Sequence, residues 1–209
     1  YIFVLRYIPI YGIIIAFKDF RIHKNGFLYS LMTSKWIGFK NFEFLFKTQD
    51  AKIIFRNTIC YSLLFLFLGL IFQIIVALLL LEMTNRRTVK VYQTLIIFPH
   101  FLSMVIVAFF VYVFLAPKEG LINNILVAMG FERIEWYMEP KYWPYILTIV
   151  TLWKGTGYGS IMYLATITGF DQELYEAAVI DGATKWQQTT KITLPLLKPI
   201  ISIMLILGL

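Results

Sequence analysis

A run of 21 residues from Tyr61 to Leu81 reads YSLLFLFLGLIFQIIVALLLL and contains no charged side chain. An α-helix needs about 20 apolar residues to cross the hydrocarbon core of a bilayer, so this run has the length of a spanning helix. The strands of an outer-membrane barrel would instead show segments of about ten residues with alternating polarity. The run therefore predicts a transmembrane helix and argues against a barrel.

The composition of the whole chain agrees with this reading. Hydrophobic residues make up 59% of the sequence, against about half in an ordinary soluble domain. A soluble protein of this length cannot bury so much apolar surface in one core. We therefore predict an all-α, polytopic helical membrane protein. The formal net charge of +7 then indicates contact with lipid headgroups, and nucleic acid is not expected as a partner.

Other apolar runs divide the chain into spans and loops. Arg6 and Pro9 interrupt the first run, and residues 19–56 form a mixed loop in which we expect short interfacial helices, one of them around 41–46. The chain begins with Tyr1 and ends inside an apolar run, so we expect a fragment that is incomplete at both ends. The predicted spans are 1–18 (a remnant), 57–81, 91–116, 142–170 and a fifth that begins near Pro199.

The polar segment 171–198 separates the last two spans and predicts two short helices. Asp171 is a suitable N-cap for a helix through Ile180. Gly182 stands where helices often end in a left-handed residue. Thr184 with Gln187 has the spacing of a capping box that starts a second helix. Pro195 is predicted to end that helix, because a proline in a helix interior loses a hydrogen bond and clashes with the preceding turn.

The spacing of seven residues in this segment resembles the cytoplasmic coupling loop, or EAA motif, of permease subunits in binding-protein-dependent ABC importers. An ordinary amphipathic connector between spans is the alternative, and so many positions in register favour the coupling loop. The seven residues are Glu176, Ala177, Ala178, Gly182, Ile192, Leu194 and Pro195.

The flanking sequence extends the resemblance over essentially the whole chain. Residues 148–160 (TIVTLWKGTGYGS) and 161–178 (IMYLATITGFDQELYEAA) resemble the carbohydrate-uptake permeases. Residues 6–20 (RYIPIYGIIIAFKDF) and 36–46 (WIGFKNFEFLF) resemble the subgroup that imports complex oligosaccharides and polysaccharide fragments.

This resemblance implies a fold, a location and partners. It implies the transmembrane-domain fold of a type I ABC importer, with residues 1–209 as a single permease domain that holds about five of six core spans. The expected location is the bacterial cytoplasmic (inner) membrane, with residues 171–198 on the cytoplasmic side. The implied partners are a second homologous permease subunit, an ABC ATPase dimer and an extracellular or periplasmic solute-binding protein.

The implied contact with the ATPase places coupling residues along the segment 171–198. They are Glu176, Ala177, Ala178, Asp181, Gly182, Ala183, Trp186, Ile192, Leu194 and Pro195. The sequence has no G-x-x-x-x-G-K-[ST] phosphate-binding loop. We therefore expect that this chain does not hydrolyse ATP itself. The resemblance implies a transport subunit with no enzymatic activity, no catalytic residue and no cofactor of its own, with ATP and Mg bound by the partner ATPase.

Four residues of the fourth span are candidates for a substrate path. Lys154 lies inside an apolar run, where a charge is costly; it either lines the path or extends its ammonium to the membrane interface. Trp153, Tyr158 and Tyr163 offer flat rings on which sugars stack, or they belong to the aromatic belt of the membrane. No metal site is expected, because His23 and His100 are isolated from other potential ligands.

Basic residues do not support the orientation that the resemblance implies. Lys and Arg are usually more frequent in cytoplasmic loops. Here the loops on the opposite side from 171–198, residues 19–56 and 117–141, hold more of them than the links 82–90 and 171–198.

Three other functions are open. One is an ABC importer permease for a non-sugar solute. Another is an ion-driven secondary transporter, but no acidic residue lies deep in a predicted span. The third is a membrane-embedded enzyme, which would need clustered acid/base or metal-binding residues inside the spans.

Overall fold

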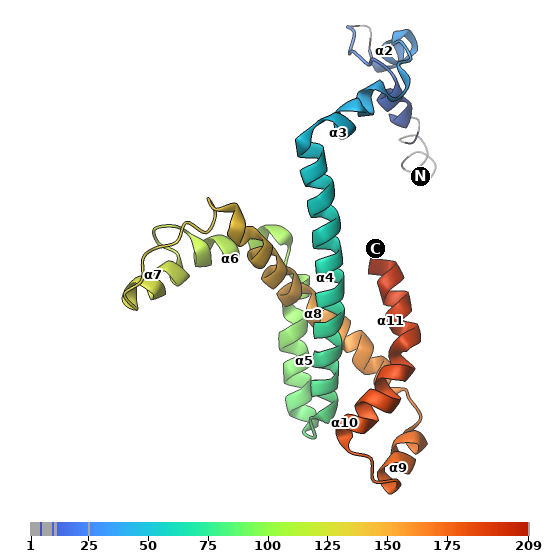
Figure 1. Cartoon of the computed structure of the whole chain (residues 1–209), viewed down its shortest axis with the longest axis vertical. Helices are drawn as coiled ribbons and strands as arrows, with labels where there is room; N and C mark the ends of the chain where they lie inside the picture. Colours follow the sequence, from blue (N-terminus) through green and yellow to red (C-terminus); the bar gives the residue numbers. More distant parts are fainter. Residues whose placement is uncertain (1–4, 6–9, 11, 25, 209) are drawn as a thin grey trace. The chain divides into compact units, whose positions relative to one another are not determined.

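The computed structural model describes residues 5, 10, 12–24 and 26–208, and within these ranges the chain is helical with no strand. An isolated bridge pairs Lys18 with Trp36. This confirms the predicted all-α class. Residue contacts divide the chain into two units, 1–60 and 61–209, and Figure 1 shows their elements.

The first unit contains short helical segments that lead into α4(Gln49–Glu82). The segments are η2(Gly12–Phe17), α2(Phe27–Thr33), η3(Gly38–Phe42) and α3(Glu43–Lys47). Half of the predicted first span, including Arg6 and Pro9, lies outside the described residues; the last part of the span contains the 3₁₀ turn η2. The short helix expected around 41–46 is present as the end of η3 and most of α3.

A side-chain amide and a group of rings hold the first unit together. The Asn41 Nδ2 donates to the carbonyl oxygens of Ala16 and Lys18, at 3.0 and 2.9 Å. The Phe17 ring stacks on Trp36 with 5.7 Å between ring centroids, and it also contacts Phe39 and Phe42. The motif WIGFKNF therefore folds back onto the segment that precedes α2.

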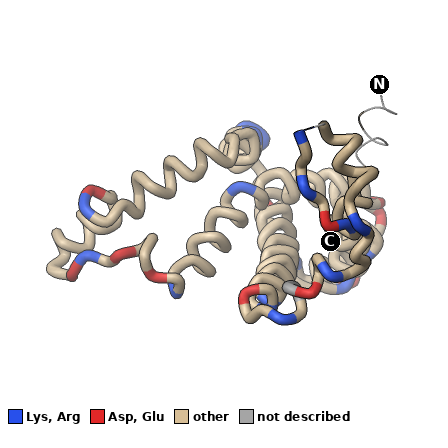
Figure 2. Tube along the Cα trace, turned by 90° about the horizontal axis from the view of Figure 1, so that it is seen from above, with Lys and Arg blue, Asp and Glu red and all other residues tan. Residues whose placement is uncertain are grey.

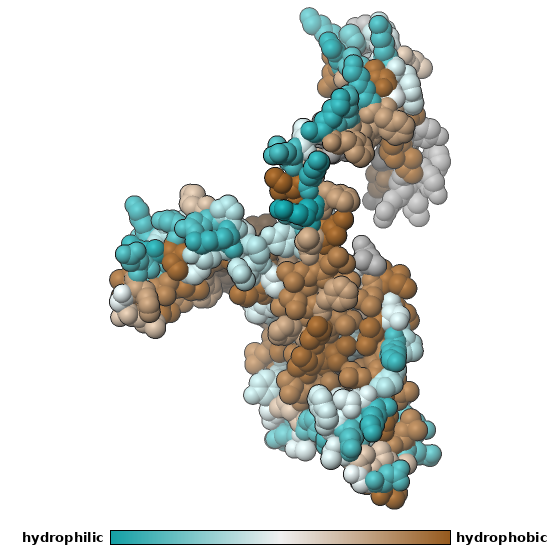
Figure 3. Space-filling model, in the orientation of Figure 1, coloured by the Kyte–Doolittle hydropathy of each residue, from teal (hydrophilic) through white to brown (hydrophobic). Residues whose placement is uncertain are grey.

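The second unit is built on α5(Arg86–Phe101) and α8(Trp143–Thr168), which pack against each other. The remaining elements are α6(Met104–Leu115), α7(Leu121–Ala128), η4(Pro140–Tyr142), α9(Gln172–Ile180), α10(Lys185–Gln188), the π-helical turn η5(Thr189–Thr193) and α11(Leu194–Gly208). Charged residues lie mostly at helix ends and in loops (Figure 2). An apolar band covers the middle of this unit, and its lower end, with α9 and α10, is more hydrophilic (Figure 3).

Two described stretches are long and apolar enough to cross a membrane, namely Gln49–Glu82 and Lys185–Gly208. The pair α5 and α6 adds a third only if it is one broken span, because the two helices meet at an angle of 100°. The prediction of one continuous span over 91–116 is therefore wrong. After the break, Ser103 is the N-cap of α6 and accepts a hydrogen bond from the Ile106 amide.

The predicted stop at Pro195 is also wrong. The stretch Lys185–Gly208 is continuous, with Pro195 and Pro199 inside α11, so the fifth span begins well before Pro199. The wide turn η5 lies directly before α11. Local π-helical adjustments let membrane helices accept prolines, because they provide new partners for backbone groups that a proline leaves free.

Close backbone approach brings α8 against its neighbours. A β-carbon added at Gly157 would lie 1.8 Å from the Ile96 carbonyl oxygen of α5. One added at Gly159 would lie 2.1 Å from the Gln73 Cδ of α4. Since lipid removes the hydrophobic drive between helices, small residues that permit such contact are what hold membrane helices together.

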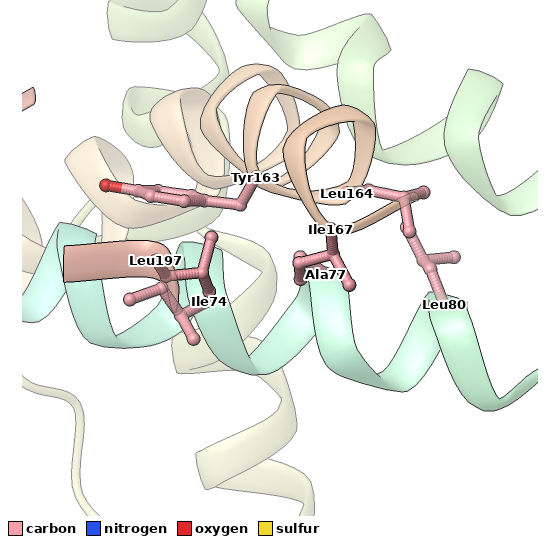
Figure 4. Packing of buried hydrophobic residues seen from close by; sticks show 7 residues of the cluster. All are labelled: Ile74, Ala77, Leu80, Tyr163, Leu164, Ile167 and Leu197. Carbon is pink, nitrogen blue, oxygen red and sulfur yellow. The ribbon is translucent and has the colours of Figure 1, made fainter. Parts of the chain in front are cut away.

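The buried core lies where α4, α8 and α11 meet. Its members are Ile74, Ala77 and Leu80 of α4, Tyr163, Leu164 and Ile167 of α8, and Leu197 of α11 (Figure 4). The side chains of Ala77, Tyr163 and Leu197 have no exposed surface. The C-terminal part of α8 therefore packs closely against both long apolar stretches.

A buried amide organises the segment after α6. The Asn123 side chain is fully buried. Its Nδ2 donates to the carbonyl oxygens of Pro117 and Ile134, at 3.0 and 2.9 Å. Its Oδ1 accepts from the Ile134 amide and from the indole N–H of Trp136, both at 3.1 Å. A single side chain thus closes the loop around α7.

The glycine contact yields a matched pair of substitutions. Gly157→Ala should lower the free energy of unfolding by about 1–3 kcal/mol, because the added methyl group meets backbone that cannot move aside freely. Gly155→Ala is the control, since a β-carbon there has no neighbour within 4 Å. Thermal unfolding in detergent checks this, and equal melting temperatures for the two variants would contradict the close packing.

Candidate functional site

The segment 171–198, which we call the coupling segment, folds locally as its polar residues predict. Asp171 caps α9 by accepting a hydrogen bond from the Glu173 amide at 3.0 Å. Gly182 has a φ of +75° and lies in the left-handed region. Thr184 and Gln187 form a complete capping box at the start of α10. All three local predictions are confirmed.

The predicted coupling residues lie mostly at the surface. Glu176, Ala177, Asp181, Gly182 and Pro195 are exposed. Trp186 is 75% exposed. Half-buried positions are Ala178, Ala183, Ile192 and Leu194.

Two apolar residues that the sequence analysis did not single out extend this surface. Val179 and Ile180, at the end of α9, are 60% and 86% exposed. Their signal in the sequence is an apolar pair directly before the polar turn Asp181-Gly182, where an ordinary solvated helix end would carry polar residues. Together with Trp186 they give the coupling segment an exposed apolar surface at the more hydrophilic end of the unit (Figure 3).

A cavity of about 770 Å³ lies between α9 and the end of α4. Glu82 and Met83 line it from the α4 side, and Tyr175, Glu176 and Lys185 line it from the coupling segment. Acidic and basic side chains therefore face the same open space. The position of Glu176 at this rim leaves its carboxylate accessible for a polar contact.

A second cavity, of about 540 Å³, lies among α4, α8, α11 and the end of α5. Among the described residues that line it there is no Asp, Glu, Lys or Arg, and its polar side chains are those of Ser62, Gln73, His100, Tyr158 and Tyr163. The Tyr163 hydroxyl is buried and has no hydrogen-bond partner within the described part of the chain. A buried polar group without a partner costs free energy unless a water or a ligand satisfies it.

The four candidates for the substrate path do not lie together. Tyr158 and Tyr163 both line the 540 Å³ cavity. Trp153 lines a different cavity of about 860 Å³, whose other lining residues come mainly from α5, α6, α7 and α8. Lys154 lines neither of the two.

Lys154 instead binds the broken end of α5. Its Nζ donates to the carbonyl oxygens of His100 and Leu102, both at 2.8 Å. One turn further along α8, the Tyr158 ring stacks on the His100 ring, with 4.6 Å between centroids. The last carbonyls of a helix have no partner inside the helix, and a cation at that end also interacts favourably with the helix dipole. Sequence reasoning missed this contact, because no local pattern reports that two distant helices meet.

The chain is similar to known proteins over most of its length. The family of binding-protein-dependent transport system inner membrane components matches residues 69–209. The polygalacturonan/rhamnogalacturonan transport system permease protein YteP of Bacillus subtilis (strain 168) is 37% identical over 207 residues, which is 99% of this chain and 63% of the relative. The chain thus spans less than two thirds of that relative's length.

Solved structures give the same likeness. A bacterial ABC transporter involved in the import of the acidic polysaccharide alginate aligns with a TM-score of 0.87 and 35% identity, covering 99% of this chain and 67% of the other. A second structure, of the bacterial alginate ABC transporter in complex with an alginate pentasaccharide-bound periplasmic protein, aligns with a TM-score of 0.86 and 34% identity, covering 99% and 66%.

The Lys154 contact can be tested by removing its charge. Lys154→Met should lower the free energy of unfolding by about 1–3 kcal/mol, because two carbonyl groups lose a charged donor. Lys198→Met, at an exposed position in α11, is the control. Thermal unfolding in detergent compares them. A Lys154→Met protein that melts like the control but changes sugar uptake would show that the ammonium acts on the substrate.

Proposed function

Because this chain belongs to the family of binding-protein-dependent transport system inner membrane components, we propose that it is the membrane-spanning permease subunit of an ABC importer for oligosaccharides or polysaccharide fragments. The observation that carries the proposal is the coupling segment: a capped helix, a left-handed glycine and a capping-box helix in the register of the EAA motif. The proposed subunit transports and does not hydrolyse ATP.

The coupling segment is proposed to bind an ABC ATPase. Exposed apolar side chains such as Ile180 and Trp186 are the kind of surface that a partner protein covers. Ala177 and Ala178 are small, so the partner can approach α9 closely, and Glu176 offers a polar contact beside them. Each of two homologous permeases would place one such segment on one subunit of an ATPase dimer.

ATP and Mg would then act on the partner subunits. Closure of the ATPase dimer on ATP would draw the two coupling segments together and open the path to the outside. A solute-binding protein would deliver the substrate there. Support for this last partner comes from the alginate transporter, whose structure includes a pentasaccharide-bound periplasmic protein.

The 540 Å³ cavity is the proposed part of the substrate path in this chain. Its Tyr163 hydroxyl has no hydrogen-bond partner among the described residues, but it is buried, so a sugar hydroxyl or a water would reach it only after a neighbouring side chain moves. Tyr158, 49% exposed, offers a flat ring to a sugar face. Trp153 and Lys154 receive less support as path residues, because the first faces another cavity and the second is held by backbone carbonyls.

The relatives support a carbohydrate as the cargo. One is a permease for polygalacturonan/rhamnogalacturonan, and another is involved in the import of the polysaccharide alginate. Both relatives align with 99% of this chain. The aligned region therefore includes the residues of the proposed substrate path.

Purification and transport test the proposed function together. A tagged full-length protein should bring an ABC ATPase and a second permease with it from detergent extracts. The complex is then reconstituted into proteoliposomes with its binding protein. It should transport labelled oligosaccharides only when ATP is present on the side of the membrane that carries the ATPase subunits. Uptake that follows a proton or sodium gradient, with no ATPase attached, would favour a secondary transporter.

The turn at Gly182 provides a specific test of docking. Gly182→Val should abolish ATP-driven uptake while the protein stays in the membrane, because valine is strongly disfavoured at a φ of +75° and the turn would lose its shape. Gly130→Val is the control, since Gly130 is also left-handed, at +86°, but lies in the segment after α7. Normal uptake by the Gly182 variant would exclude a docking role for this turn.

A further inference from the structure

The helix α9 is joined to the following helical stretch by a side-chain hydrogen bond. The Tyr175 hydroxyl lies 2.9 Å from the Thr193 Oγ1. Tyr175 belongs to α9, and Thr193 is the last residue of the π-helical turn η5. The contact therefore bridges 18 positions of sequence, across the glycine turn that separates the two helices.

This bond matters because α9 has little packing of its own. None of the nine residues of α9, all of which the structure describes, is buried. One side of the helix borders the open 770 Å³ cavity. Its covalent connection to α10 runs through Gly182, and a glycine turn is easily deformed. Without a direct contact, α9 can move while α11 stays in place.

On its other side, the bond reaches the buried core. Thr193 is 2% exposed, and Leu197, one turn further along α11, has no exposed surface. Leu197 packs in the core cluster with Ile74 and Tyr163 (Figure 4). Tyr163 in turn lines the 540 Å³ cavity. A continuous chain of contacts thus runs from α9 to the wall of that cavity.

The turn η5 is itself held in shape. Gln188 is 5% exposed, and its Nε2 donates to the Ala183 carbonyl oxygen at 3.1 Å. π-Helical turns inside α-helices are rare and occur frequently at functional sites. Here the wide turn places the Thr193 hydroxyl where Tyr175 can reach it.

We propose that the Tyr175–Thr193 hydrogen bond is the link through which a displacement of α9 is passed to α11 and the core. The proposal rests on the proposed function of the coupling segment. Tyr175 and Thr193 are positioning residues: they are expected to transmit movement without binding ATP, ATPase or sugar. Without this hydrogen bond, the ATPase should still bind the coupling segment, but each ATP hydrolysed should drive less sugar uptake.

The test uses the assembled importer with Tyr175→Phe, Thr193→Val and the double variant. Each substitution removes one hydroxyl and keeps the shape of the side chain. The amount of sugar taken up per ATP hydrolysed should fall about fivefold in each single variant, the effect of one hydrogen bond between uncharged groups. The double variant should fall no further, because both changes remove the same contact. The amount of co-purified ATPase should match the wild type.

Thr166→Val is the matched control. It makes the same substitution in α8, outside the coupling segment, and among the described residues the Thr166 hydroxyl bonds the Met162 carbonyl oxygen of its own helix at 3.0 Å. It therefore also controls for the 3.5 Å contact of the Thr193 hydroxyl with the Gln188 carbonyl oxygen. It should leave uptake per ATP unchanged. Wild-type coupling in both single variants, multiplied losses in the double variant, or loss of the ATPase would each overturn the proposal.

Hydrogen exchange in the full-length chain separates this link from the proposed function. Amides of α9 should exchange faster in Tyr175→Phe and Thr193→Val than in the wild type or in Thr166→Val, because α9 loses its anchor. If no ATPase accompanies the wild-type protein, the proposed function fails while faster exchange still supports the link. Unchanged exchange overturns the link whatever the ATPase does.

Discussion

The close contact of α8 with α5 and α4 at Gly157 and Gly159 is the constraint on which the second unit depends. Lipid is as apolar as the side chains, so helices in a bilayer cohere through tight packing and polar contacts rather than through release of water. Two glycines two positions apart put the α8 backbone against two different helices. The core residues Tyr163 and Ile167 lie on the same helix, one to three turns after these glycines.

Polar side chains then hold the irregular parts in place. Lys154 satisfies the carbonyls where α5 stops, and Asn123 does the same for the loop around α7. Backbone groups away from water need partners, and long or branched polar side chains provide them where no regular helix can. The sharp break between α5 and α6 persists because Ser103 caps one side and Lys154 binds the other.

The coupling segment, in contrast to α8, has few buried contacts. Its helix α9 is exposed on most sides and is anchored by little more than Tyr175 and the turn at Gly182. An element with few buried contacts moves at a low cost in free energy. A helix that has to follow a partner protein needs this freedom, together with one firm connection to the helices behind it.

Much of this protein is legible in its sequence, because it depends on local chemistry. The apolar run from Tyr61 predicts a spanning helix, and Asp171, Gly182 and Thr184 predict the caps and turn of the coupling segment, since each acts on backbone only a few residues away. Contacts between distant segments were decided by the tertiary structure. The break before Ser103, the continuation of the helix through Pro195 and the partners of Lys154 depend on neighbours that no local pattern reports. Backbone groups freed at a break or a proline are stable only when another part of the fold supplies their partners. Sequence alone therefore predicted the individual helices, caps and turns, and tertiary packing decided where helices break or continue and which of them are in contact.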